Sequence, residues 1–410
     1  MTITERRDKK VFRFIVALIV YVSGVIVPYF VSVTYAQALQ ALSLIPMMVY
    51  GSQLVEFTFD SPYFRLAFML FMFSNAFIMV RVEHLGYVHM KELLFSDFRL
   101  WPYLVPFVAL MVRREYFFRN LFNWLYWLGV AFLVISPLLW KIFNNTPGAG
   151  ELSVVFFTSG SGFVLLTWKY HTFNRRVIAA AAVLLALLIA TILARRNVML
   201  TNIDFIIFAF LTYLFFVSDN ATKKFMSIYG FAVIIIAGLY IFEEQKNTNF
   251  KLIATRANDD TREYVFNQFF SSMQNNMWWG RGMDGTYYCP LVTEDTNVDA
   301  VEYRDLIECG YLQVILKGGY INLFLFLAVM VPALFLGLFD SRNVFTKACG
   351  VIIVLWLIDM GPYGIPSMSV KYILVWICVG VCYNRKIRLA DESYIDDLIN
   401  RKAEKIQIIN

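Results

Sequence analysis

Long apolar stretches follow one another along most of this chain, separated by short polar connections. A helix that crosses a lipid bilayer needs about 20 apolar residues, and by that measure we expect about twelve spanning helices. They cover approximately residues 11–31, 36–55, 63–81, 99–113, 121–143, 152–170, 177–194, 197–217, 225–243, 310–338, 344–360 and 369–383. The pattern therefore predicts an all-α polytopic membrane protein that forms one integral domain over residues 1–410.

One polar segment, residues 244–309, breaks this pattern between the ninth and tenth predicted spans. Almost every other connection is short. A bundle of helices that only passes solute has little use for one large external loop, whereas an enzyme that works at the membrane face does. We therefore expect a large, partly helical loop that carries part of an active site.

The composition agrees with a membrane protein because the chain carries few charges. Charged residues make up 16% and hydrophobic residues 59% of the 410 residues, whereas roughly a quarter of a soluble domain is charged. The first apolar run is too long for a removable signal peptide and lacks a small-residue cleavage site after it. Residues 1–10 are therefore expected to remain as a short cytosolic tail.

Lysine and arginine mark alternate connections, which sets the expected orientation because cytoplasmic loops carry an excess of both. The connections placed inside contain Arg6, Arg7, Lys9, Lys10, Arg113, Arg114, Arg119, Lys169, Arg175, Arg176, Lys223, Lys224, Arg342, Lys347, Arg385, Lys386 and Arg388. This assignment places both termini in the cytoplasm, including a tail over residues 384–410, and the long loop outside.

Arg195 and Arg196 lie on the outer side by this topology, where they oppose the orientation signal. Arginine stays charged and presents a planar fork of donors suited to phosphate. The pair would suit a diphosphate whose lipid tail lies in the bilayer. The alternative is that both side chains reach out to lipid headgroups.

The long loop opens with two more arginines, Arg256 and Arg262. After Arg262, the spacing of Phe266, Phe269 and Phe270 predicts a surface helix that buries these three rings. Such a helix would place Arg262 near its start, at the membrane face.

A turn rich in tryptophan and glycine follows at residues 276–285. Its glycines allow the backbone to approach a ligand closely, and Trp278 and Trp279 would stack on sugar rings or lie at the membrane interface. Arg281 sits within this turn. We take all three side chains as candidates for substrate binding.

The loop ends in acidic residues, of which Glu308 directly precedes the tenth predicted span. A carboxylate at a membrane boundary is partly desolvated, which raises its pKa and improves it as a proton acceptor near neutral pH. Asp305 lies about one helical turn earlier and would share the same face. Glu308 and Asp305 are therefore the candidate general bases. Cys289 and Cys309 in the same loop could pair in an oxidising compartment.

Motifs for cofactors are missing from the sequence. It has no Walker A loop, dinucleotide fingerprint or GxSxG elbow, and the five-residue spacing of His84 and His89 does not fit a zinc site. We therefore expect no metal, no cofactor and no nucleic acid partner. A reaction outside the cytosol must then use an already activated substrate.

Taken in order, these features resemble the superfamily of bacterial O-antigen ligases and of O-antigen and exopolysaccharide polymerases. The matching segments are the arginine pair at 195–196, Arg262 with its aromatic helix, the turn at 276–285, and Glu308-Cys309-Gly310-Tyr311-Leu312 ahead of Gly318-Gly319. The ligases have a histidine as general base where this chain has Glu308-Cys309, and this difference favours a polymerase.

The resemblance implies a fold of the GT-C type in the bacterial inner membrane, with the long loop in the periplasm. It implies a polyprenyl-diphosphate-linked oligosaccharide as donor, a second such unit as acceptor, and inverting transfer without metal. Arg262, Arg195 and Arg196 would neutralise the diphosphate, and Arg256, Arg281, Trp278, Trp279 and Tyr311 would help to bind the glycan. A chain-length regulator is a possible partner besides the bilayer.

Three alternatives remain open. A ligase would transfer a finished glycan to lipid A-core or to a protein. A transporter of lipid-linked glycan or solute would use charges within the membrane, for which Asp204, Asp359 and Lys371 are the candidates. A membrane scaffold without catalytic activity is the third alternative.

Overall fold

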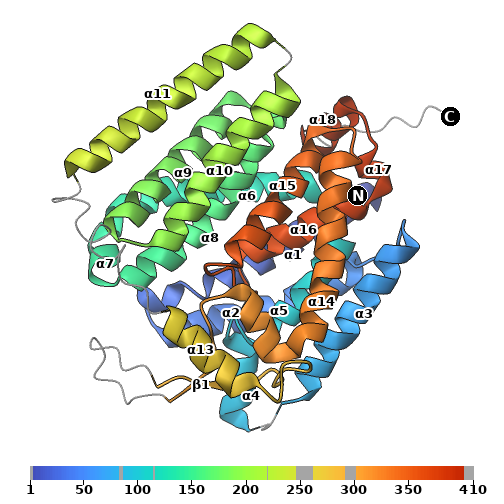
Figure 1. Ribbon diagram of the computed structural model, residues 1–410. Helices are drawn as coiled ribbons and strands as arrows, with labels where there is room; N and C mark the ends of the chain where they lie inside the picture. Colours follow the sequence, from blue (N-terminus) through green and yellow to red (C-terminus); the bar gives the residue numbers. More distant parts are fainter. Residues whose placement is uncertain are drawn as a thin grey trace.

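The computed structural model describes residues 3–82, 86–113, 116–218, 220–245, 262–290 and 302–400, and these residues are mainly α-helical (Figure 1). The first half contains α1 (Ile3–Ser23), α2 (Val33–Leu54), α3 (Pro62–Val80), α4 (Tyr87–Phe95), α5 (Trp101–Leu104), α6 (Phe117–Leu138), α7 (Trp140–Asn145), α8 (Pro147–Leu166) and α9 (Phe173–Ile192). The second half contains α10 (Arg196–Thr212), α11 (Ala221–Gln245), α13 (Arg262–Met273), α14 (Gly310–Phe339), α15 (Val344–Asp359), α16 (Val370–Tyr383), α17 (Arg385–Arg388) and α18 (Glu392–Asn400). A two-stranded antiparallel sheet pairs β1 (Tyr287–Tyr288) with β2 (Tyr303–Arg304).

Each predicted span coincides with a helical segment, and six of these segments in the described part of the chain are long and apolar enough to cross a membrane. The six are α3, α6, α8, α9, α14, and α10 with the π-helical turn Tyr213–Val217 that extends it. The all-α membrane class predicted from the sequence agrees with this architecture.

Two predicted spans are interrupted, for local reasons. The span at 11–31 ends as an α-helix at Ser23, and a 3-10 turn with Pro28 near its start follows. The span at 99–113 becomes the four-residue helix α5 and the 3-10 segment Val105–Leu110, with Pro102 and Pro106 at their starts. Proline has no backbone N–H and clashes with a preceding helical turn, so both segments are shorter than predicted.

The core is centred on α16, which lies between α14, α15 and the Val105–Leu110 segment (Figure 1). Every residue of α16 except Lys371 is buried. A helix that is apolar on all sides has no solvent-facing stripe and belongs in the interior. Trp376 stacks on Phe71 of α3 at 5.6 Å between ring centroids, and Tyr383 stacks on Phe64 at 3.9 Å.

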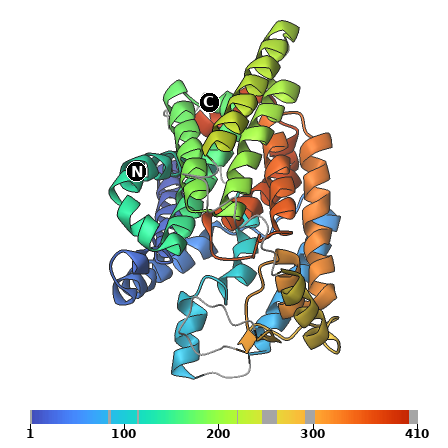
Figure 2. The same ribbon diagram turned by 60° about the vertical axis from the view of Figure 1, so that its left-hand side comes forward.

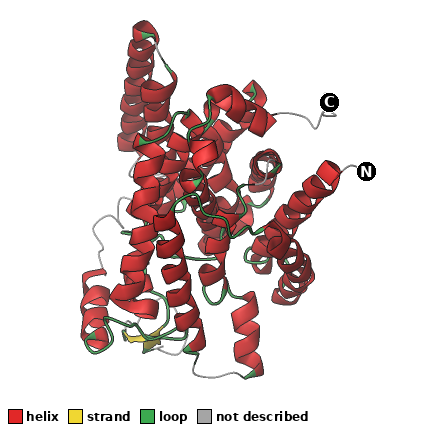
Figure 3. Cartoon of the chain, turned by 90° about the vertical axis from the view of Figure 1, so that its right-hand side faces the viewer, coloured by secondary structure: helices red, strands yellow, loops and turns green. Residues whose placement is uncertain are grey.

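The described parts of the predicted loop gather at one end of the molecule. Figure 2 shows α13 and the strand pair at the end opposite to α18 and the beginning of the chain, and Figure 3 shows the strands at the end away from both termini. This region has its own small core, in which Phe269 and Met273 of α13 pack with Tyr287, Ile307 and Leu316. The predicted helix after Arg262 is confirmed over Arg262–Met273. Phe270, however, is exposed, because consecutive residues of a helix point in different directions.

Cys289 and Cys309 lie in the same small core as free thiols. The pairing that the sequence left open is therefore not formed. Both residues act here as small buried groups.

Helix α14 is broken at Gly319, and the tryptophan–glycine turn packs into the break. Gly319 has φ of +71°, and a Cβ there would lie 2.1 Å from the carbonyl oxygen of Trp278. The amides of Arg281 and Gly282 donate to the carbonyls of Leu316 and Lys317 at 2.8 and 2.9 Å. The two glycine motifs singled out in the sequence therefore bind each other through their backbones.

Candidate functional site

A cavity of about 660 Å³ opens where the beginnings of α8, α10 and α13 meet the segments at 95–98, 308 and 362–363. We call it the arginine cavity. Its charged and polar lining residues are Arg195, Arg196, Arg262, Asp97, Glu151, Glu308, Gln37, Gln40, Asn197, Tyr29 and Tyr363. Its volume falls within the range of typical ligand sites. Three predicted arginines and one predicted carboxylate, from three distant places in the sequence, thus line one cavity.

Arg195 and Arg196 reach the cavity because the chain reverses sharply between α9 and α10. Ala194 has φ of +53°, and the amide of Arg195 donates to the carbonyl of Ala190 at 2.8 Å. Arg195 is then the N-cap residue of α10, and Arg196 is its first residue. Both charges add to the partial positive charge of a helix N-terminus, so this wall of the cavity favours an anion.

The charge of Arg195 is partly balanced within the cavity. Its guanidinium lies 3.2 Å from the carboxylate of Glu151, and both side chains are partly buried. Arg196 is exposed to the cavity. Arg262 begins α13, also lines the cavity and is partly buried.

Glu308 also faces the cavity, and the backbone around it is fixed by Gln313 of α14. The Gln313 side chain accepts a hydrogen bond from the amide of Ile307 at 3.0 Å and donates to the carbonyl of Asp305 at 3.1 Å. The amide of Gly310 donates to the carbonyl of Met360 at 2.8 Å. Glu308 is therefore an exposed carboxylate on a firmly held segment.

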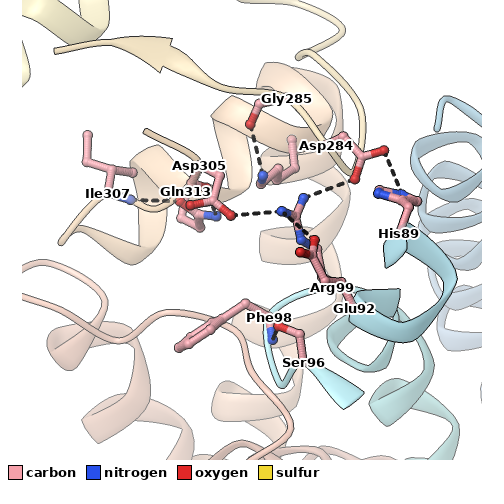
Figure 4. Close-up of polar contacts among 11 residues, drawn as sticks. His89, Glu92, Ser96, Phe98, Arg99, Asp284, Gly285, Asp305, Ile307 and Gln313 are labelled. Carbon is pink, nitrogen blue, oxygen red and sulfur yellow. Dashed lines mark hydrogen bonds and ion pairs between the residues drawn. The ribbon is translucent and has the colours of Figure 1, made fainter. Parts of the chain in front are cut away.

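Asp305 points into a different set of contacts (Figure 4). Its carboxylate lies 3.1 Å from the guanidinium of Arg99, which also contacts Asp284 at 3.0 Å and Glu92 at 3.8 Å. Asp284 in turn lies 3.1 Å from Nε2 of His89. We call these residues the Arg99 network. It ties the described end of the loop to α4 and the segment before α5, whereas Asp305 is not among the residues that line the arginine cavity.

The other predicted binding residues lie away from the cavity. Arg281 donates to the backbone carbonyls of Thr286, at 2.6 Å, and Ser272, so its side chain stabilises the turn. Trp278 and Trp279 are 67% and 59% exposed and contact Tyr320 and Phe77 respectively. The Tyr311 hydroxyl donates to the carbonyl of Leu357 at 2.6 Å. Arg256 lies outside the described residues, as does His84.

The sequence analysis did not single out the lining residues Asp97, Glu151 and Tyr363. Asp97 lies between α4 and α5, where burial raises the pKa of its carboxyl to about 6. Glu151 lies in the first turns of α8. Burial, together with the charges of Glu151 and Glu308, raises the pKa of the Tyr363 hydroxyl above its ordinary value. A lone carboxylate at the edge of an apolar stretch, as at Asp97 and Glu151, is the signal that could have identified them.

A second, smaller cavity of about 80 Å³ adjoins the first and shares Asp97, Glu151 and Tyr363 with it. It reaches a buried ion pair in which Nζ of Lys371 lies 2.8 Å from Asp359. Lys371 also donates to the hydroxyl of Thr201 at 3.1 Å. Charges within apolar helices are costly unless paired, and here they are paired at the inner end of the cavity.

Within the described ranges, no group of three or more histidine, cysteine, aspartate or glutamate side chains could hold a metal ion. The arrangement offers anion binding by arginines and proton transfer by carboxylates. Comparison with protein-family models gave no match. Neither the curated proteins nor the solved structures gave a match either.

Proposed function

We propose that this chain is a membrane glycosyltransferase that joins polyprenyl-diphosphate-linked oligosaccharide units into a polysaccharide. One observation carries the proposal. Arg195, Arg196, Arg262 and Glu308 come from three places in the sequence that resemble one enzyme superfamily, and all line the same cavity. Arginines that hold a diphosphate and a carboxylate that accepts a proton are the groups this reaction requires.

The chemistry follows from the charges. The acceptor hydroxyl attacks the anomeric carbon of the donor, the bond to the diphosphate oxygen breaks with its electron pair, and the hydroxyl proton passes to a carboxylate. Arginines at the start of α10 and α13 would stabilise the charge that develops on the diphosphate, a contribution of several kcal/mol in a site with little water. Attack from the opposite face inverts the anomeric configuration.

Glu308 is the carboxylate best placed to take the proton. Glu151 is paired with Arg195, and Asp305 is paired with Arg99. Glu308 is exposed to the cavity on a segment that Gln313 holds. Asp97 is the second carboxylate that faces this space and is available for the same role.

The proposal includes the twelve-span topology of a bacterial inner-membrane protein, with cytoplasmic termini and the loop in the periplasm. The lipid tail of the donor would lie between apolar helices beside the cavity. A chain-length regulator would be a protein partner. A ligase would use the same cavity with a different acceptor.

The test is a reconstitution of the purified protein in liposomes with polyprenyl-diphosphate-linked repeat units, without nucleotide or added metal. A ladder of products on a gel supports a polymerase. One shifted band that depends on an added acceptor, such as lipid A-core, indicates a ligase. The Arg196→Gln variant should lose product, whereas Arg65→Gln, at an exposed position of α3, should not.

A transporter is the second candidate, and the buried Asp359–Lys371 pair with Thr201 favours it. A buried ion pair at the inner end of a cavity is typical of proteins that move ions or solutes. In the same liposomes, movement of the lipid-linked substrate across the bilayer without any product would support this function and contradict the enzyme.

A further inference from the structure

A separate polar cavity lies at the other end of the helices from the arginine cavity and from the small cavity beside it. It measures about 660 Å³, and its lining includes Tyr126, Lys169, His171, Arg175, Asp396 and Asn400. Helix α8 begins at Pro147 beside the arginine cavity, which Gly148 and Glu151 line, and it ends at Leu166, shortly before Lys169. Its 20 residues span about 30 Å, so the two cavities are separated by roughly the thickness of a bilayer core. We call this one the His171 cavity.

One wall of the His171 cavity favours an anion. Helix α9 begins there, its N-cap residue Thr172 makes no side-chain cap, and its first turn contains no acidic residue. The first amides of a helix lack helical partners. Arg175 lies in this first turn, with its guanidinium 5.8 Å from the centroid of the Tyr126 ring. Lys169 adds a second cation, which a weak ion pair at 3.4 Å joins to Glu392.

His171 supplies a different kind of group. Its side chain is only 3% exposed, and Nδ1 is buried without a hydrogen-bond partner among the described residues. Burial, with help from Arg175 and Arg176, lowers the pKa of the imidazole to about 3, so the ring is neutral. A neutral ring carries one proton, and the hydrogen bonds decide which nitrogen has it.

The contacts of Thr167 place that proton on Nε2. The Thr167 hydroxyl donates its single hydrogen to the carbonyl of Phe163 at 2.7 Å. Its oxygen also lies 2.9 Å from Nε2 of His171, so it accepts from Nε2–H. Nδ1 is then a bare acceptor, and it belongs to a side chain that lines the cavity. A simple anion would not satisfy it, because it requires a hydrogen-bond donor.

We propose that the His171 cavity binds a phosphate ester that also carries a hydrogen-bond donor, such as the headgroup of an aminophospholipid. The phosphate would lie against Arg175, Lys169 and the start of α9. The amine would donate to Nδ1 of His171, and the carboxylate of Asp396 also lines the cavity.

A lipid is the expected source of this ester. The cavity lies beside the first half of α6 and the start of α9, and both helices are long and apolar enough to span a membrane. Trp127 of α6 lines it and is 59% exposed. Exposed tryptophan and tyrosine are enriched at the level of lipid headgroups. This inference does not depend on the glycosyltransferase proposal, because it concerns a different cavity.

The test compares ligands that differ only in the donor. Native mass spectrometry of the full-length protein in detergent would measure binding of short-chain phosphatidylethanolamine and phosphatidylcholine. The choline headgroup keeps the phosphate and the positive charge but has no N–H. We expect phosphatidylethanolamine to bind about ten-fold more tightly, the effect of one charge-assisted hydrogen bond. Equal affinities would overturn the proposal, and this comparison needs no variant.

Variants then test which side chains contact the amine and the phosphate of the lipid. His171→Phe keeps an aromatic ring against Phe122 and should remove the preference for phosphatidylethanolamine. Arg175→Gln should weaken both lipids about ten-fold, and Arg176→Gln is the matched control because Arg176 lies over the Trp168 ring and does not line the cavity. Equal losses in Arg175→Gln and Arg176→Gln would contradict a specific site.

Two further measurements test whether the ester is a lipid or a soluble molecule, and whether it contacts Nδ1 of His171. Soluble glycerophosphoethanolamine that binds as tightly as the lipid would support the same chemistry with a soluble ester, whereas weak binding would assign the site to the lipid. The chain has 3 histidines, so nitrogen-15 labelling of histidine gives few signals, and His171→Phe assigns one. Its Nδ1 signal should shift with phosphatidylethanolamine but not with phosphatidylcholine, and an unchanged signal would overturn the proposal.

Discussion

The guanidinium of Arg195 lies 3.2 Å from the carboxylate of Glu151 inside the arginine cavity. A bound diphosphate would compete with Glu151 for this arginine. We therefore expect Glu151→Gln and Arg195→Gln to act in opposite directions. Glu151→Gln should strengthen pyrophosphate binding about three- to ten-fold, and Arg195→Gln should weaken it by a similar factor.

Isothermal titration of the purified protein with pyrophosphate measures both affinities. Arg65→Gln serves as the control, since it removes an equal charge from an exposed position. A loss of affinity in Glu151→Gln would show that this carboxylate does not compete with the ligand.

Glu308 and Asp305 differ in what they face, and this leads to a second prediction. Glu308 lines the arginine cavity, whereas Asp305 pairs with Arg99. Loss of a general base typically costs a factor of 10²–10⁴ in rate, so Glu308→Gln should reduce polymer formation by about that factor. Asp305→Asn should reduce it less than about ten-fold. The yield of polymer in the liposome assay measures both losses. A larger loss in Asp305→Asn than in Glu308→Gln would assign the general base to Asp305.

Arg99 contacts three carboxylates, those of Asp284, Asp305 and Glu92. Arg99→Gln would leave these negative charges close together without their shared cation. We expect a loss of about 1–3 kcal/mol in local stability, less than for a fully buried pair because Asp305 and Glu92 are partly exposed. Hydrogen exchange at residues 284–288 and 302–308 should rise, while α16 should remain protected. Unchanged exchange would mean that the small core alone holds this region.

Gly319 is expected to tolerate no side chain. A Cβ there would lie 2.1 Å from the Trp278 carbonyl, and φ is +71°. Gly319→Ala should lower the free energy of unfolding by about 2 kcal/mol or more, because it strains the backbone and disrupts the contact with the tryptophan–glycine turn. Gly230→Ala on α11 is the matched control, because no atom lies within 4 Å of its added Cβ. Thermal unfolding of both variants in detergent would show equal midpoints if the close contact were unimportant.

Asp97 predicts a pH dependence of stability. Its carboxyl has a pKa of about 6 in the folded protein against an ordinary value of 3.8, because burial disfavours the charged form. Between these two values the folded state holds a proton that the unfolded state has released, so stability falls as pH rises. The fall amounts to about 2 kcal/mol between pH 4 and pH 6, and to about 3 kcal/mol over the whole titration.

Asp97→Asn removes this titration. The variant should match the wild type near pH 4 and exceed it by up to about 3 kcal/mol at pH 7. Denaturation in detergent at several pH values measures the difference. A constant difference over this range would show that Asp97 is not desolvated.

Hydrophobic patterning predicted the helices well, because a run of apolar residues is a local property. It failed where local chemistry intervened, as at Pro28, Pro102 and Pro106. The arginines at the start of α10 and α13 were found because each stands out against its neighbours. Their meeting in one cavity with Glu308 depends on how helices pack, which no single segment encodes.

The same limit explains the residues that the sequence misjudged or missed. Arg281 has the chemistry of a ligand-binding residue, yet its donors go to backbone carbonyls of Thr286 and Ser272. Asp97 and Glu151 carry no motif and became candidates only when two distant segments placed them around the same space. What distinguishes Asp97 and Glu151 from Arg281 is therefore which elements lie next to each residue, and not the type of the residue.

The buried helix α16 has a consequence for how the protein fits a bilayer. Its 14 residues span about 21 Å, less than the roughly 30 Å of a hydrocarbon core. Because protein surrounds all of it except Lys371, lipid thickness places no demand on its length; only the outer helices must match the membrane.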